Sequence, residues 1–137
     1  MIGNAAAALQ GAPVTTLDVD FMFRKTSHNL NKLKSFADIL ESTILRPYYP
    51  VSGLYRVVND ERGIQIDFMA TIHGIKSFES LRADSVSVDF EGYPLSVANL
   101  RKIIESKKAL GRDKDRTDLK ILEKTLREKE KQKRGNT

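Results

Sequence analysis

The sequence predicts an α+β (α/β) fold in which a small mixed β-sheet is flanked by helices, with further helices at the C-terminus. Segments with apolar residues at every second position lie between segments with helical apolar spacing, and the order is helix, strand, helix, strands, helices. At 137 residues the chain is expected to form one domain, residues 1–137, with a core over 1–95 and C-terminal helices over 96–137.

The first two elements are expected to bring two acidic residues onto one face. Residues 5–10 are strong helix formers followed by Gly11, which predicts a short helix with a glycine stop. Residues 17–23 predict a strand, because apolar residues occupy every second position. The same alternation turns Asp18 and Asp20 to one side of that strand.

A long amphipathic helix is predicted next. Residues 29–45 carry apolar side chains at helical spacing, and Pro47 and Pro50 are expected to end the helix. We expect this helix to cover one side of the sheet.

A β-hairpin with an acidic residue on its polar face follows. Residues 54–58 and 64–69 alternate in hydrophobicity around a turn at 59–63, whose Asp and Gly residues suit a tight connection. In the second strand, Asp67 lies with Gln65 on the face opposite to the apolar residues.

The rest of the chain predicts two short strands and two helices. The strands are expected at residues 85–90 and 93–96. A helix is expected over 97–106, broken at Gly111, and a last helix with a charged end over 117–133.

Composition narrows the class of partner and the compartment. The chain has 23 Lys and Arg against 18 Asp and Glu, a net charge of +5 that favours anionic partners such as nucleotides or nucleic acid. It has no cysteine, which excludes disulfides, thiolate zinc sites and a Cys nucleophile. With no basic leader and no long apolar run, we expect a cytoplasmic protein without a membrane partner.

The acidic residues of the predicted sheet form a candidate metal site. Asp18 and Asp20 share a strand face, whereas Asp113 and Asp115 open a helix, where residues two apart diverge. If Asp67 lies on the adjacent strand, three carboxylates meet and can hold Mg²⁺ or Mn²⁺. The alternative is that these acids serve solubility at a strand edge or pair with nearby Lys and Arg.

A phosphate-binding element is expected beside this site. Gly3 and Asn4 open the first helix, whose free N–H groups and dipole attract phosphate. Only a short loop separates them from the Asp pair, and phosphate binding next to a metal site points to a functional arrangement.

These motifs together resemble those of the nucleotidyltransferase superfamily related to DNA polymerase beta, especially its small bacterial and archaeal members found in toxin–antitoxin pairs. The resemblance rests on Gly3-Asn4-Ala5-Ala6, Gln10-Gly11, Thr16, Asp18-x-Asp20 and Ile66-Asp67-Phe68. Residues 107–119, with Gly111-Arg112 and Lys114-Asp115, are similar to the Lys-rich helical segment of that family. The resemblance therefore spans most of the chain and implies the nucleotidyltransferase fold.

The resemblance also implies a reaction. A nucleoside monophosphate passes from a nucleoside triphosphate to a hydroxyl group on a protein, an RNA or a small molecule, and pyrophosphate leaves. Asp18, Asp20 and Asp67 are the implied catalytic residues and Mg²⁺ (or Mn²⁺) ligands, with Asp67 also a candidate base. The implied nucleotide-binding residues are Gly3, Asn4, Thr16, Lys107, Arg112 and Lys114; for the last three the alternative is a solvated turn between helices.

Departures from the family pattern support a second hypothesis. Asn4 replaces a usual Gly or Ser, Gln10 a usual His and Val14 a usual Arg, which favours a catalytically inactive protein-binding module. The chain begins close to the glycine turn, so a protein partner or a second copy of the chain could complete the sheet edge. A third hypothesis is a nucleic-acid binder that uses the basic segment 124–134.

Overall fold

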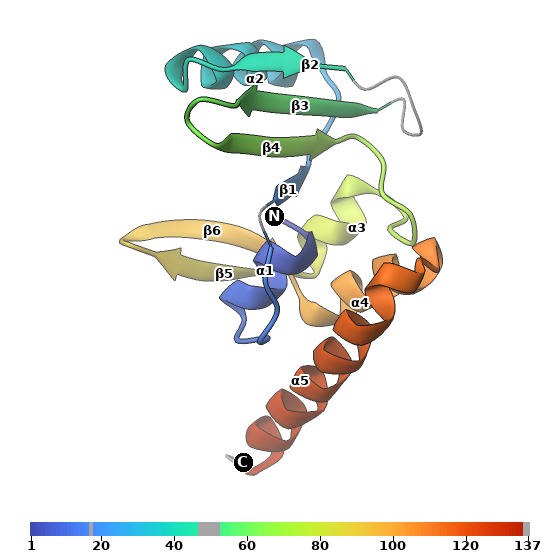
Figure 1. Ribbon diagram of the computed structural model, residues 1–137. Helices are drawn as coiled ribbons and strands as arrows, with labels where there is room; N and C mark the ends of the chain where they lie inside the picture. The colour runs from blue at the N-terminus through green and yellow to red at the C-terminus, as the bar shows by residue number, and fades with distance from the viewer. Residues whose placement is uncertain (17, 47–52, 136–137) are drawn as a thin grey trace.

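The computed structural model describes residues 1–16, 18–46 and 53–135, and these form a mixed α+β structure (Figure 1). The helices of this part of the chain are α1 (Gly3–Leu9), α2 (Ser27–Ile39), α3 (Phe78–Ala83), α4 (Leu100–Leu110) and α5 (Arg116–Gly135), with a short 3₁₀ turn at Asp113–Asp115. The strands are β1 (Val19–Met22), β2 (Thr43–Leu45), β3 (Leu54–Asn59), β4 (Ile64–Met69), β5 (Ser85–Phe90) and β6 (Tyr93–Ala98).

The main sheet is small and mixed, as the sequence predicts. Its strand order is β1-β4-β3-β2, with β1 parallel to β4 and the other neighbours antiparallel. The predicted hairpin is confirmed as β3 and β4, and the predicted first strand is confirmed over Val19–Met22. Leu17, the first residue of that prediction, lies outside the described residues. In the sheet, β1 forms one edge.

The helix predicted over residues 29–45 is wrong at its C-terminal end. α2 begins after Thr26, whose hydroxyl accepts a hydrogen bond from the N–H of Asn29, and it ends at Ile39. Glu41 has a φ of 52°, a conformation that stops a helix, and the β-branched residues after it form the edge strand β2. Ile44 therefore packs on the α2 side of the sheet from a strand. Pro47 and Pro50 lie outside the described residues.

The two later strands form a separate sheet. β5 and β6 pair only with each other in the described structure, and this hairpin projects from the rest of the molecule (Figure 1). Its connection to the main sheet runs through the N-terminus: the N–H of Ala98 donates to the carbonyl of Met1, and the N–H of Ile2 donates to the carbonyl of Asp20. Residues 1 and 2 thus join β6 to β1.

The C-terminal helices follow the predicted order with a shifted start. α4 begins at Leu100 instead of residue 97, because Val97 and Ala98 pair in β6 and the Asn99 side chain accepts from the N–H of Lys102. Gly111 ends α4 in the left-handed conformation with a φ of 61°, as its sequence position predicts. The last helix is confirmed and extends to Gly135. The short helix α3 was not predicted.

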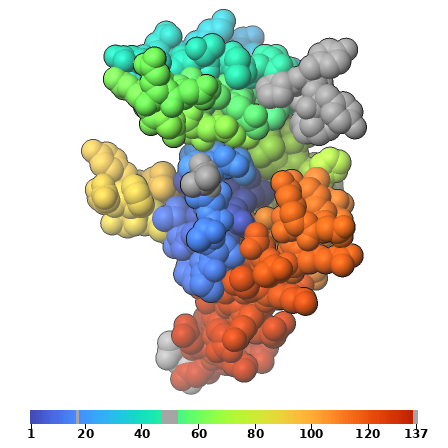
Figure 2. All heavy atoms as spheres, viewed as in Figure 1, coloured from blue at the N-terminus to red at the C-terminus, as the bar shows by residue number. Residues whose placement is uncertain are grey.

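Apolar side chains gather in two clusters. One lies between α2 and the main sheet and includes Leu33 and Val57. The other lies between α1, α4, α5 and the β5–β6 hairpin. It includes Ile103 and Leu122, both almost fully buried. Figure 2 shows the N-terminal segment between the β5–β6 hairpin and the α4–α5 turn. Within the described residues, no helix has the length and apolar character needed to cross a bilayer.

Removing a leucine side chain should lower the stability of the protein much more inside the second cluster than at an exposed position. Leu122 is 0% exposed, so Leu122→Ala should lower the free energy of unfolding by about 2–5 kcal/mol. The same substitution at Leu110, which is 37% exposed, is the matched control and should cost much less. Urea denaturation of both variants measures the difference, and equal losses would contradict the packing described here.

Candidate functional site

Three acidic side chains meet on neighbouring strands of the main sheet. The parallel register pairs Asp20 of β1 with Asp67 of β4, so their side chains lie on the same face. Asp18 precedes β1 on that face, and its Oδ1 accepts a hydrogen bond from Gln65 Nε2 at 3.3 Å. The expected juxtaposition of the acids is therefore present in the structure.

The third acid is already engaged by a cation. Arg56 lies directly opposite Asp67 in the β3–β4 pair, and its guanidinium donates Nε–H to Oδ1 at 2.8 Å and Nη2–H to Oδ2 at 3.0 Å. The hydrogen bond to Asp67 raises the pKa of Arg56. In the parts of the chain that the structure describes, no three His, Cys, Asp or Glu side chains are arranged to hold a metal ion. Both carboxylate oxygens of Asp67 are bound by Arg56 instead.

The middle acid lacks full charge compensation. The pKa of Asp20 is raised from its ordinary value of 3.8 to about 6, first by burial and then by the negative charges of Asp67 and Asp18. Lys107 and Arg112 act in the opposite direction. The acidic face would therefore be stabilised by additional positive charge.

The glycine turn lies against this acid. Gly3 has a φ of 78°, and a β-carbon on it would lie 2.9 Å from Oδ2 of Asp20. A side chain at position 3 would therefore be strained in its backbone and would displace the carboxylate. The predicted proximity of Gly3 to the Asp pair is present in the structure.

Two of the predicted nucleotide-binding residues make internal contacts. Asn4 Nδ2 donates to Oδ2 of Asp118 in α5 at 2.9 Å, while its Oδ1 is buried and accepts no hydrogen bond from the described residues. The Thr16 hydroxyl donates to the carbonyl of Asp18 and accepts from the N–H of Asp18, both at 3.0 Å. Thr16 thus fixes the backbone that enters β1, and Asn4 ties α1 to α5.

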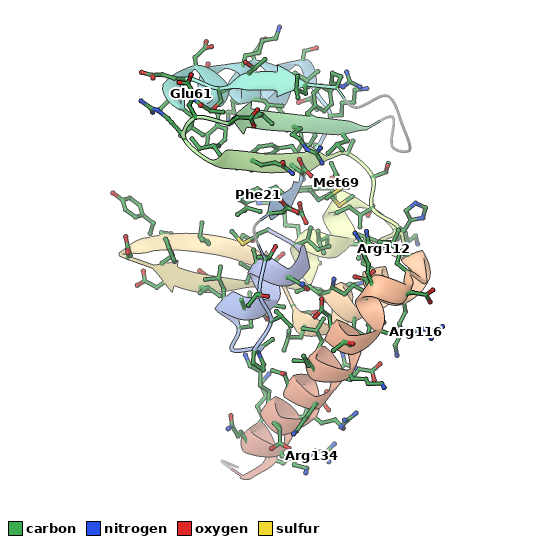
Figure 3. All side chains as sticks on the ribbon, viewed as in Figure 1. Phe21, Glu61, Met69, Arg112, Arg116 and Arg134 are labelled. Carbon is green, nitrogen blue, oxygen red and sulfur yellow. The ribbon has the colours of Figure 1, made fainter. Side chains whose placement is uncertain are left out.

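Of the three basic residues predicted to bind nucleotide, two form ion pairs with a buried carboxylate and one is exposed. Lys107 Nζ lies 3.2 Å from Oδ1 of the buried Asp115, and Arg112 Nε lies 2.7 Å from its Oδ2. Burial acts to raise the pKa of Asp115, but the hydrogen bonds from Arg112 and Lys107 hold it below the ordinary value. Lys114 is exposed and forms no ion pair within the described ranges. Figure 3 shows Arg112 at the end of the α4–α5 pair that lies nearer to the main sheet.

Sequence reasoning missed three side chains that organise this site: Arg56, Asp115 and Asp118. The predicted hairpin brought Arg56 near Asp67 but not into register, because a turn at 59–63 places residue 56 opposite residue 66. In the structure Asn59 pairs with Ile64, and this shift of one residue sets Arg56 opposite Asp67. No local pattern indicates that Asp115 receives both cations or that Asp118 reaches Asn4, because these contacts join separate elements.

Two comparisons with known proteins give no match. No protein-family model matches the chain, and a search of curated proteins finds no significant match.

Because the pKa of Asp20 is raised, we expect the stability of the fold to depend on pH. The pKa of Asp20 is higher in the folded chain, so its contribution to stability is fully present below about pH 4 and is lost as the pH rises through about 6. Asp20→Asn removes this loss. We expect the variant to exceed the wild type by about 1–3 kcal/mol at pH 7.5 in metal-free buffer, with little difference at pH 4.

Urea denaturation at the two pH values tests this expectation. Asp38→Asn, at an exposed position of α2, controls for the substitution itself. A gain of the same size at pH 4 and pH 7.5 would show that altered packing, and not ionisation of Asp20, is responsible.

Proposed function

We propose that this chain is a divalent-metal-dependent nucleotidyltransferase that moves a nucleoside monophosphate from a nucleoside triphosphate to a hydroxyl group of a protein, an RNA or a small molecule. The observation that carries the proposal is the parallel β1–β4 pair, which places Asp18, Asp20 and Asp67 on one face. Gly3 lies against that face, and the charges of Lys107 and Arg112 act on it.

The donor set suits Mg²⁺ or Mn²⁺. Carboxylate oxygens are the ligands these ions prefer, and the raised pKa of Asp20 indicates that the face favours added positive charge. Asp18 and Asp20 would hold the ion, joined by Asp67 once it releases Arg56. A bound ion would compensate charge on the phosphates and polarise their oxygens.

The chain's own residues then have distinct tasks. Asp115 holds Lys107 and Arg112 near the acidic face, where they can bind phosphate oxygens. Gly3 leaves room for a close approach to Asp20. Asp67, when free of Arg56, is the candidate acceptor for the proton of the attacking hydroxyl.

The internal contacts of the site favour a second candidate, a catalytically inactive protein-binding module of the same fold. Arg56 occupies both oxygens of Asp67, and Asn4 is bound to Asp118. Gln10, which stands where the resembled family has His, donates to the carbonyls of Ala6 and Ala98. Such a module would bind a protein partner, whereas the resemblance connects the transferase with toxin–antitoxin pairs.

Nucleotide binding separates the two candidates. Titration calorimetry with ATP, GTP, CTP and UTP in the presence of Mg²⁺ should show binding by the wild type, and Asp18→Ala/Asp20→Ala should lose at least about tenfold in affinity. Asp38→Ala/Asp60→Ala removes two exposed acids elsewhere and should bind as the wild type does. Absence of nucleotide binding by folded wild-type protein would reject the enzyme and leave the binding module.

The Arg56–Asp67 contact predicts competition between a guanidinium and a metal ion. Arg56→Gln frees the Asp67 oxygens and removes a positive charge, so Mn²⁺ affinity should rise about threefold to tenfold, as measured by electron paramagnetic resonance of free Mn²⁺. The metal-free variant should melt at a lower temperature, because the buried carboxylate of Asp67 loses its partner.

Arg62→Gln is the matched control for this experiment. Arg62 pairs with Glu41 at 2.9 Å on the exposed surface, so its replacement should change Mn²⁺ affinity little. If Arg56→Gln and Arg62→Gln have the same Mn²⁺ affinity, Asp67 does not take part in metal binding.

A further inference from the structure

An apolar groove on the main sheet collects five of the six phenylalanines of the chain. It lies between α2 and α3 along β1 and encloses about 610 Å³. Its phenylalanines are Phe21, Phe23, Phe36, Phe68 and Phe78. Each of these side chains is only partly buried, although the chain has other apolar positions that are buried completely. The groove therefore exposes a continuous aromatic surface, which is characteristic of a binding site.

The rings of the groove are held in fixed orientations. Phe68 lies at their centre, with Phe21 stacked on it at a centroid distance of 5.3 Å. Phe36 and Phe23 approach Phe68 edge-on, at 5.6 Å and 6.3 Å. Such pairs restrain one another, so the floor of the groove is ordered before any ligand arrives.

The rim of the groove is positively charged. Arg24, Lys32 and Arg82 line it, and none of the acidic residues that the structure describes does. Arg24 is bound to Glu79 at 2.7 Å and lies over the ring of Phe78. Lys32 and Arg82, on opposite helices, form no ion pair within residues 1–16, 18–46 and 53–135. The rim therefore offers two cations to a ligand.

We propose that this groove binds a small free amphipathic anion, an acyl or aryl carboxylate whose apolar part packs on the phenyl rings. Its carboxylate would pair with Lys32 and Arg82. The volume lies within the range of about 300–1,000 Å³ that is typical of small-molecule sites, and such sites combine an apolar lining with a few polar groups. The proposal is independent of the transferase, because the residues that line the groove do not include its acids or bases.

The phenylalanines provide a direct test. Five of the six line the groove, and the sixth, Phe90, lies outside it in β5. In protein labelled with ¹³C on the phenyl rings, decanoate below its micelle concentration should shift the signals of the groove phenylalanines saturably and leave that of Phe90 unchanged. Decyltrimethylammonium, with the same chain and the opposite charge, should bind at least about threefold more weakly.

Charge reversal on the rim tests the contribution of the head group. Lys32→Glu and Arg82→Glu should each raise the dissociation constant for decanoate about threefold to tenfold. Lys34→Glu is the matched control, because Lys34 is exposed on α2 but does not line the groove, and it should bind as the wild type does. Thermal melting confirms that each variant is folded.

Three outcomes would overturn the proposal. The first is the absence of a saturable shift of the groove phenylalanines in the folded wild type, and the second is equal weakening by Lys32→Glu and Lys34→Glu. The third is a shift of these phenylalanine signals that depends on protein concentration without ligand, which would assign the groove to a second copy of the chain. Binding to anionic vesicles without binding of monomeric decanoate would equally reject a free ligand.

Discussion

The close approach of two carboxylates across β1 and β4 is the constraint on which the arrangement of this molecule depends. Asp20 and Asp67 are register partners in adjacent parallel strands, so both charges lie on one face of the sheet. Like charges at such a separation are unfavourable unless cations compensate them. Arg56 compensates Asp67 through two hydrogen bonds, and Lys107 of α4 and Arg112, just after α4, act on Asp20.

This charge balance links elements that are far apart in the sequence. The buried Asp115 fixes Lys107 of α4 and Arg112 after it, and so orients the α4–α5 pair at the end nearer to the sheet. Asn4 joins α1 to α5 through Asp118, and residues 1 and 2 join β6 to β1. The polar contacts around the acidic face thus join the same elements, among them α1, α4, α5 and β6, whose apolar side chains form the second cluster.

The molecule presents two kinds of surface with different chemistry. The acidic face carries carboxylates whose charge is only partly compensated, which favours cations and, through them, phosphates. The phenylalanine groove is apolar with a cationic rim, which favours an apolar anion. The segment 124–134, considered for nucleic acid, is part of α5, and Glu128 and Glu130 within it pair with Lys131 and Arg101. These pairs reduce the positive charge that the segment presents.

The sequence by itself determined the local elements: alternation indicated the β3–β4 hairpin and the shared face of Asp18 and Asp20, and Gly111 indicated the end of α4. It could not distinguish the strand β2 from the end of a helix, because Ile44 satisfies both periodicities. Only the tertiary structure decided that Asp67 binds Arg56 and that Asp115 receives two cations. Hydrophobic periodicity reports which side of an element is buried, whereas the partner of a charged side chain depends on how separate elements pack.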